Sequence, residues 1–153
     1  MTLGDIGPNS FLREIEEFLH RQIPLSRSMG VQVESHDEDQ LALTAPLALN
    51  HNHLGTAFGG SLSALATLAG YGLLWTQLED KSAHIVIRES QIVYLHPVTS
   101  QLRMTCKNPE SSSLAAFKET FRIKGRARIR LEVTAVEEGR VCVVYKGTYV
   151  AIC

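Results

Sequence analysis

The chain has 153 residues, of which 44% are hydrophobic and 20% charged, the composition of an ordinary globular domain. This length predicts one domain over residues 1–153, large enough to bury a core without structural metals or disulfides. A net charge of −1 argues against nucleic acid or an anionic membrane surface as the partner of the whole chain. Three widely spaced cysteines, Cys106, Cys142 and Cys153, favour a reducing cytoplasm.

The first expected elements are one helix and two strands. Asn9 or Ser10 can cap a helix over about residues 9–22, where apolar residues recur at helical spacing before a proline ends the pattern. Alternating apolar residues then predict two short strands, near 31–33 and over 41–45, joined by an acidic turn.

The next stretch, from Leu54 to Leu78, contains no charged residue and follows the polar segment 50–53. It predicts a long central helix over about residues 56–79, apolar on every side, which must be buried in lipid or in protein. Its length suits a membrane span, but five glycines and five Ser or Thr residues interrupt it, and basic flanking residues are missing. We therefore expect no membrane span, and place this helix at the centre of a soluble fold.

The rest of the chain is expected to be mainly β. Strands are predicted over 85–95 and 100–107, and a short helix over 114–121. Alternation is clearest over 126–135, where odd positions are apolar and even positions polar, and a Glu-Gly turn leads into a last strand over 141–152. A sheet that wraps one apolar helix belongs to the α+β class.

This order, and the segment PLALNHNHLGTAFGGSLSALATLAGYGLLW (Pro46–Trp75), resemble hotdog-fold proteins, in which a curved antiparallel β-sheet wraps around one long central helix. The segment is similar to the thioesterase family found as the C-terminal domain of YiiD-type proteins, which includes members linked to malonyl-acyl-carrier-protein decarboxylation. The strand 92–98 and the ending 149–151 fit the same family.

The resemblance implies an enzyme of fatty-acid metabolism that acts on acyl thioesters. Its substrate is expected to be an acyl-CoA or an acyl thioester on acyl carrier protein, with no cofactor. It also implies a homodimer or dimer of dimers, in which two sheets join edge to edge and the site lies between subunits.

The start of the predicted central helix offers hydrogen-bond donors. The first four amides of a helix lack intrahelical acceptors and carry partial positive charge. Gly59 and Gly60 have no side chains to block a substrate carbonyl, so these amides can form an oxyanion hole, with Gly60 as a catalytic candidate. Alternatively, both glycines only allow close packing. Thr56, Phe58 and Ser61, beside these glycines, are further candidate substrate-binding residues.

Asn52 is the leading catalytic candidate. Its side chain offers a donor and an acceptor without net charge, and by resemblance it matches the essential asparagine of the family. Asn50 either contacts substrate or braces the loop. His53 is a substrate-binding candidate or proton carrier, with an ordinary loop residue as the alternative. Because His51 and His53 have no third ligand nearby in the sequence, no metal is expected.

A general base is harder to place. Many hotdog thioesterases have a carboxylate in or just before the central helix, but none lies between Asp39 and Glu79 here. Glu89 is the candidate base for hydrolysis, and its alternative is a solvated carboxylate or a partner of Arg88. Decarboxylation of a malonyl thioester needs no base. The family resemblance implies a thioesterase, which is the leading prediction. Decarboxylation, which the residues fit somewhat better, and a non-catalytic acyl-thioester binding module stay open as alternatives.

The last third of the chain carries a basic cluster. It holds six of the 15 basic residues, namely Lys118, Arg122, Lys124, Arg126, Arg128 and Arg130. Arg126 and Arg128 are expected to contact the phosphates of coenzyme A or an acidic carrier protein. A solvated outer strand face is the alternative.

Overall fold

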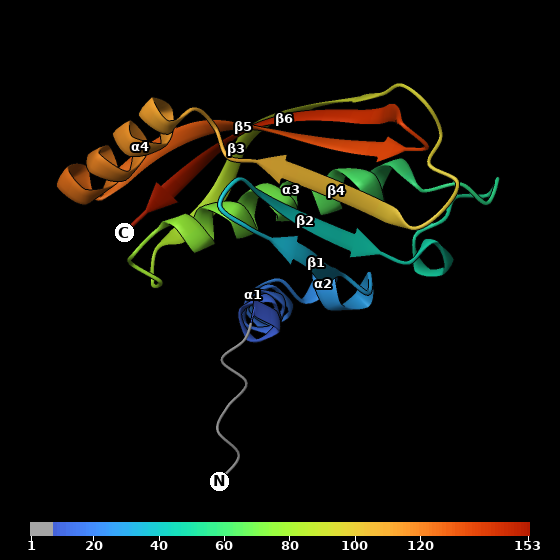
Figure 1. Ribbon diagram of the computed structural model, residues 1–153, viewed down its shortest axis with the longest axis horizontal. Coiled ribbons are helices and arrows are strands. Elements are labelled where there is room, and N and C mark those ends of the chain that lie inside the picture. Colours follow the sequence, from blue (N-terminus) through green and yellow to red (C-terminus); the bar gives the residue numbers. More distant parts are fainter. Residues whose placement is uncertain (1–7) are drawn as a thin grey trace, which may run out of the picture.

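The computed structural model describes residues 8–153, in which one antiparallel sheet curves around a long helix (Figure 1). The helices are α1 (Pro8–Gln22), α2 (Pro24–Ser28), α3 (Gly59–Gln77) and α4 (Ser111–Lys124), with a single 3-10 turn η1 (Leu47–Leu49). The strands are β1 (Gln32–His36), β2 (Gln40–Ala45), β3 (His84–Tyr94), β4 (Leu102–Lys107), β5 (Arg126–Glu137) and β6 (Arg140–Ile152).

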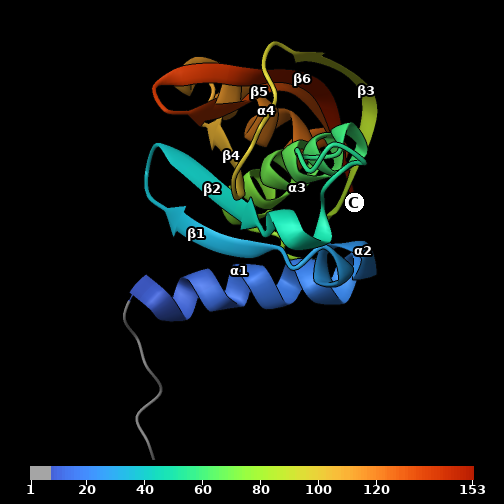
Figure 2. The ribbon, with the colours of Figure 1, turned by 90° about the vertical axis from the view of Figure 1, so that its right-hand side faces the viewer.

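The six strands form one sheet in the order β1-β2-β4-β5-β6-β3, and every neighbouring pair is antiparallel. Figure 2 shows the sheet curving over α3, with α1 lying along the β1 side. This arrangement confirms the expected hotdog fold. Strands β1 and β3 form the two edges of the sheet, and β3 is the longer edge, with 11 residues.

Helix α3 fits against the sheet because its side chains are small or apolar at nearly every position. Leu65, Leu73 and Leu74 are fully buried. The Tyr149 hydroxyl donates to the Thr67 carbonyl at 2.9 Å, and the Thr67 and Tyr145 hydroxyls share a hydrogen bond of 2.8 Å. Buried hydroxyls on the sheet are thus paired with polar atoms of the helix, as buried polar groups require. Among residues 8–153, no helix has both the length and the apolar character needed to cross a membrane.

Two helix boundaries differ from the sequence predictions. Helix α3 starts at Gly59, not at about 56, because the preceding backbone bonds elsewhere: Ala57 N donates to Val98 O and Phe58 N to Asn50 O. Helix α1 already includes Asn9 and Ser10, so neither residue precedes the helix as its cap. A proline at the first position of α2 starts a further short helix that the apolar pattern did not predict.

Candidate functional site

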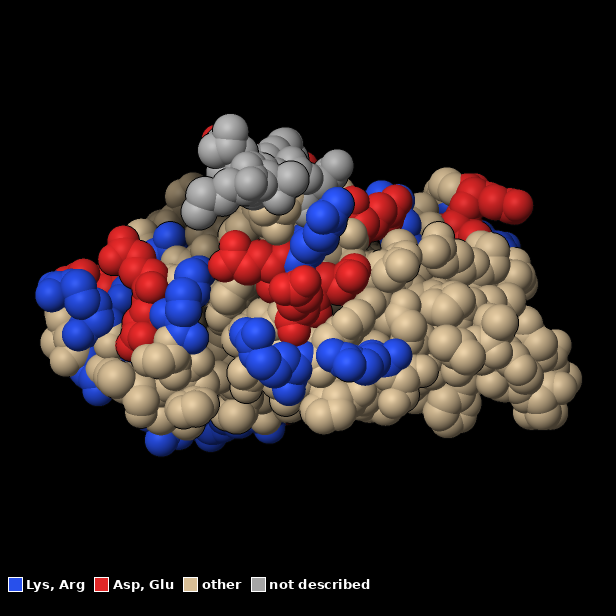
Figure 3. Space-filling view, turned by 90° about the horizontal axis from the view of Figure 1, so that it is seen from below, with Lys and Arg blue, Asp and Glu red and all other residues tan. Residues whose placement is uncertain are grey.

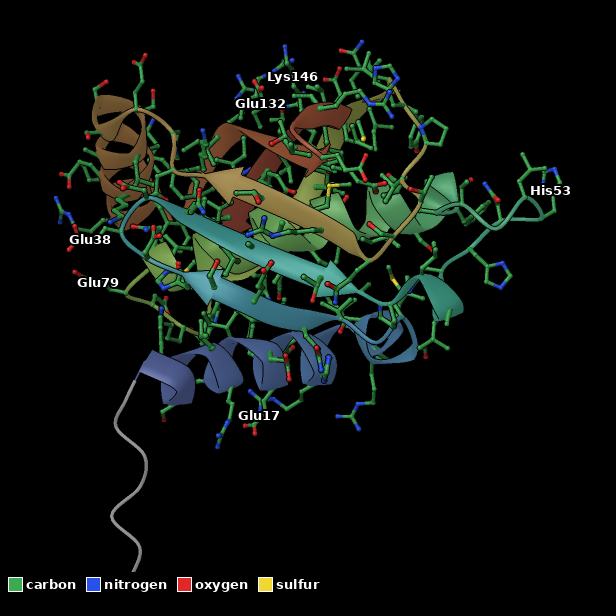
Figure 4. All side chains as sticks on the ribbon, turned by 45° about the vertical axis from the view of Figure 1, so that its right-hand side comes forward. Glu17, Glu38, His53, Glu79, Glu132 and Lys146 are labelled. Carbon is green, nitrogen blue, oxygen red and sulfur yellow. The ribbon has the colours of Figure 1, made fainter. Side chains whose placement is uncertain are left out.

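The loop between η1 and α3 is organised by the Asn52 side chain. Its Oδ1 atom accepts hydrogen bonds from the backbone amides of Leu54 (2.8 Å) and Thr56 (3.1 Å), and its Nδ2 atom donates to Thr56 Oγ1 (2.8 Å). Gly55, at φ +80°, supplies the left-handed conformation that closes this turn. His53 lies at the protruding tip of the loop (Figure 4). Asn52 therefore has a defined local role, and one Nδ2 hydrogen is left for another partner.

The Asn50 side chain is placed for bracing the loop. It is 3% exposed, and its Nδ2 atom donates to the carbonyls of Met29 (2.9 Å) and Pro46 (2.8 Å). Both amide hydrogens are thus used inside the protein, which leaves no donor on this side chain for a substrate.

Replacing Asn50 with alanine should therefore destabilise the fold by about 1–3 kcal/mol, because buried carbonyls lose their donor. Urea unfolding monitored by circular dichroism measures the loss. His53→Ala is the matched control, since an exposed loop side chain should change stability by less than about 0.5 kcal/mol. Equal stability of Asn50→Ala and the unchanged protein would contradict the bracing role.

Two aromatic rings lie beside the first glycines of α3. The first intrahelical bond runs from Leu62 N to Phe58 O, so Gly59, Gly60 and Ser61 have no acceptor within the helix. A Cβ atom at Gly60 would lie 2.5 Å from the Phe58 ring, and one at Gly59 would lie 3.3 Å from the Tyr94 ring. In the single chain both glycines therefore make room for aromatic rings. This agrees with the alternative that they only allow close packing.

Tyr94 is a residue of this region that the sequence did not single out. Its hydroxyl donates to Gly59 O at 2.8 Å, which joins the end of β3 to the first residue of α3. Burial raises the pKa of the Tyr94 hydroxyl, so it remains a donor at neutral pH. The sequence could not predict this contact, because Tyr94 and Gly59 are 35 residues apart and meet only in the folded chain. Phe58 and Tyr94 are about half exposed, so neither ring is locked in place by the core.

Glu89 does not face the α3 side of the sheet. It lies opposite Thr148, which lies opposite Arg130, and directly opposed residues in antiparallel strands point to the same face. Arg130 belongs to the outer, exposed face of β5, so Glu89 points outward too and is exposed. Within the single chain, the sheet register therefore keeps Glu89 apart from Asn52 and from the amides of α3, and its role as a base stays a prediction.

Because of this placement, Glu89→Gln should leave kcat for a thioester within about twofold, whereas loss of a general base would cost roughly 10²–10⁴-fold. Steady-state kinetics on the folded variant, over a range of thioester concentrations, makes the comparison. A drop of tenfold or more in kcat would return Glu89 to the mechanism, as the sequence reasoning expected.

Two carboxylates and one buried thiol are poor candidates for a base or nucleophile at this site. Glu38 and Glu79 lie at the opposite end of the molecule from His53 (Figure 4). Burial raises the pKa of the Cys106 thiol to about 12, so it is no thiolate nucleophile at neutral pH. His51 Nδ1 is hydrogen-bonded to Asn52 O at 2.8 Å. Within residues 8–153, no three His, Cys, Asp or Glu side chains are grouped as metal ligands.

The basic residues that are clustered in the sequence lie on two separate elements, strand β5 and helix α4. Arg126, Arg128 and Arg130 alternate along the outer face of β5. Lys118 and Arg122, on α4, line a separate cavity of about 580 Å³ near the end of α3. Arg122 is paired there with Glu119, so the arginines of β5 form the stronger unpaired positive surface.

A curved sheet around one central helix, with a polar loop and free amides at the start of that helix, defines a hotdog-fold protein. Residues 12–153 match the family described as "Putative thioesterase (yiiD_Cterm)", and the chain belongs to this family. Both the fold and the family suggested by the segment Pro46–Trp75 are thereby confirmed.

Solved structures give the same result. A protein of unknown function from Chlorobaculum tepidum TLS is 33% identical, with a TM-score of 0.86 over 95% of this chain and 96% of that chain. A "putative thioesterase" from Shewanella oneidensis is 30% identical, with a TM-score of 0.81 over 95% and 99% of the two chains. A "probable thioesterase" from Pseudomonas aeruginosa, 21% identical with a TM-score of 0.78 over 92% and 94%, shares the fold.

Proposed function

We propose that this protein is an enzyme acting on acyl thioesters, with its site at Asn52 and the first amides of α3. One observation carries the proposal: three successive amides, of Gly59, Gly60 and Ser61, precede the first intrahelical bond of a 19-residue helix, directly after the Asn52 turn. Such donors stabilise negative charge that develops on a thioester oxygen. Membership of the thioesterase family supports the same substrate class.

The reaction that this geometry supports best is decarboxylation of a malonyl thioester. The bond between the carboxylate carbon and the methylene carbon breaks and CO2 leaves, while the electron pair of that bond stays behind and forms an enolate whose oxygen is held by the amides. Water then protonates the carbon, which gives the acetyl thioester, and the remaining hydroxide combines with CO2 to form bicarbonate. No base takes part, in agreement with the outward position of Glu89. The Phe58 ring, which is 55% exposed, must turn away from Gly60 to admit the substrate.

Hydrolysis of an acyl-CoA or acyl-carrier-protein thioester is the second candidate. Its support is the family description and the name of the Shewanella relative. It requires a base to activate water, a role for which His53, exposed on the loop beside Asn52, is the nearest titratable side chain with no assigned contact.

A homodimer joined through β3 is part of this proposal. The edge of β3 away from β6 has no neighbouring strand, and several of its apolar side chains, together with Leu95, are exposed: Val86, Ile87, Val93, Tyr94 and Leu95. Exposed edges need covering. The end of the molecule that carries the 50–58 loop is also largely free of charge in Figure 3, and Leu49, Leu54 and Phe58 are more than half exposed.

Light scattering at micromolar concentration, without detergent, should therefore report a dimer or a dimer of dimers. Val93→Lys should shift the protein toward monomer, because a lysine on an edge strand opposes pairing with a second strand. Val141→Lys, at a similarly exposed position on β6, is the control and should leave the assembly unchanged. A stable monomer of the unchanged protein would contradict the dimer.

The proposed activity is tested by mixing the protein with malonyl, acetyl and long-chain acyl thioesters and identifying the products by mass spectrometry. Acetyl thioester formed from malonyl thioester supports decarboxylation. Free acid supports hydrolysis, and the chain length that reacts fastest defines the substrate. Unchanged thioesters throughout would overturn the enzyme proposal in favour of a binding module.

A further inference from the structure

A β-bulge brings two charged side chains of β3 to the same face. The pairing of β3 with β6 shifts register between Ile87 and Glu89, so Arg88 is the additional residue of a bulge. Arg88 and Glu89 both line one hollow on the outer face of the sheet, of about 330 Å³. Without the bulge, strict alternation would have sent these two neighbours to opposite faces.

Arginines of β5 complete this hollow. Arg128, Arg130 and the Thr148 hydroxyl group line it together with the two residues of β3. Arg128 and Arg130 also border a second hollow of about 400 Å³, between β5 and the α4 residues Ser113, Ala116, Phe117 and Thr120. Two neighbouring hollows therefore share the same pair of guanidinium groups, and Arg126 lines neither of them.

These arginines have no carboxylate partner in the described chain. Over residues 8–153 the ion pairs are Arg103 with Glu34 and Arg122 with Glu119. The outer face of β3, β5 and β6 carries two carboxylates, Glu89 and Glu132, and Glu132 lies opposite Lys146 (Figure 4). The same face carries five basic side chains: Arg88, Arg126, Arg128, Arg130 and Lys146. The hollow itself has three arginines against Glu89 alone.

We propose that this outer face is a binding site for a ligand that carries two or more phosphate groups, with Arg88, Arg128 and Arg130 as the anion-binding side chains. The planar guanidinium group binds phosphate oxygens in pairs, which lysine cannot do. Arg128 and Arg130 are about 7 Å apart along β5, and Arg88 is two strands, about 10 Å, away. That spread suits several linked phosphates better than one.

Glu89 tunes this site by opposing the ligand. A carboxylate within the hollow repels phosphate, so it weakens binding and favours ligands that neutralise more than one arginine. Glu89→Gln should accordingly tighten the binding of phosphates by about two- to fivefold, the size expected for an exposed charge. Loss of a general base would not tighten phosphate binding. The variant therefore distinguishes a role of Glu89 as general base from its role in repelling phosphate.

Two sources can supply such a ligand: the nucleotide end of coenzyme A and a free nucleoside polyphosphate. Only coenzyme A would connect this site with the proposed thioester chemistry, and only that identification rests on the proposed function. Binding of inorganic pyrophosphate does not depend on it, so failure of the site and failure of the activity are observed separately.

The test is isothermal titration calorimetry of the full chain with orthophosphate, pyrophosphate, ADP, dephospho-coenzyme A and coenzyme A. Pyrophosphate should bind more tightly than orthophosphate, and Arg128→Gln/Arg130→Gln should weaken pyrophosphate binding by at least about tenfold, the loss expected for hydrogen bonds to charged groups. The control Arg21→Gln/Arg140→Gln removes the same amount of positive charge from exposed positions elsewhere. It should change the affinity for pyrophosphate by less than about twofold.

Coenzyme A that binds more tightly than both ADP and dephospho-coenzyme A identifies the thioester carrier as the source, because its additional phosphate is then used. Equal binding of ADP and coenzyme A identifies a free nucleotide. The proposal is overturned if pyrophosphate does not bind. It is also overturned if the Arg128/Arg130 double variant and the control double variant weaken pyrophosphate binding equally. Arg88→Gln, a single change on an exposed edge, repeats the test should the double variant fail to fold.

Discussion

Replacing Asn52 with alanine should lower turnover of the preferred thioester about 10²-fold or more, the loss typical of one transition-state hydrogen bond. The structure adds a second effect. Because Asn52 holds Leu54 and Thr56 in the turn, its removal also loosens the loop that leads into α3. Turnover must therefore be measured alongside thermal unfolding, which should shift by only a few degrees.

Asn52→Asp separates the chemical role from the loop role. Aspartate keeps the acceptors for the Leu54 and Thr56 amides, and the Thr56 hydroxyl can donate to its second oxygen, so the turn should be preserved. The added negative charge opposes both the malonyl carboxylate and the enolate. Decarboxylation should fall at least as far as in Asn52→Ala. Near-normal turnover in either folded variant, or a greater loss in Asn50→Ala, would remove Asn52 from the mechanism.

The largest effect on stability is expected at Gly70. A methyl group there would overlap the ring and hydroxyl of Tyr149, whose Cε2 atom would lie 2.7 Å away. Tyr149 cannot yield easily, because it is 1% exposed and its hydroxyl is bonded to Thr67 O. Gly70→Ala should therefore destabilise the protein by about 2–3 kcal/mol, since overpacking and the lost hydrogen bond exceed the gain in helix propensity.

Gly72→Ala is the matched control, two residues further along the same helix. Its methyl group would meet Leu41 Cδ2 at 2.9 Å, the end of a flexible side chain, and nothing else closer than 3.9 Å. The helix-propensity gain of up to about 1 kcal/mol offsets that contact. Guanidinium unfolding should rank Gly70→Ala far below Gly72→Ala, and equal midpoints would show that the Tyr149 contact does not limit packing.

The central helix and the faces of β5 could be predicted because each follows from one local period. Alternation over 126–135 assigns Arg128 and Arg130 to the outside, and the register agrees. Strict alternation along β3 gives the wrong face for Glu89. Ile85 and Ile87 face the helix, because they pair with the helix-facing Ala151 and Tyr149, and alternation from them predicts that Glu89 faces the helix too. The bulge at Arg88 reverses that assignment, and nothing in the local sequence announces it.

The start of α3 shows a second limit. Gly59 and Gly60 correctly marked a place where something approaches the backbone closely, but the sequence could not say what. In the structure the approaching groups are the rings of Tyr94 and Phe58, and Tyr94 comes from a strand 35 residues away. Local sequence thus located the donors of the candidate site and the neighbouring Phe58, while the contact with Tyr94 depends on the tertiary fold.

Incubation of the protein with a malonyl thioester in ¹⁸O-labelled water, followed by mass spectrometry, tests the proposed chemistry most directly. Decarboxylation leaves the thioester bond intact, so the expected product is an acetyl thioester without ¹⁸O at its carbonyl. The unchanged protein should form it, and Asn52→Ala should form it at least about 10²-fold more slowly. Free malonate that carries ¹⁸O would show that water attacks the thioester, and would contradict the base-free mechanism.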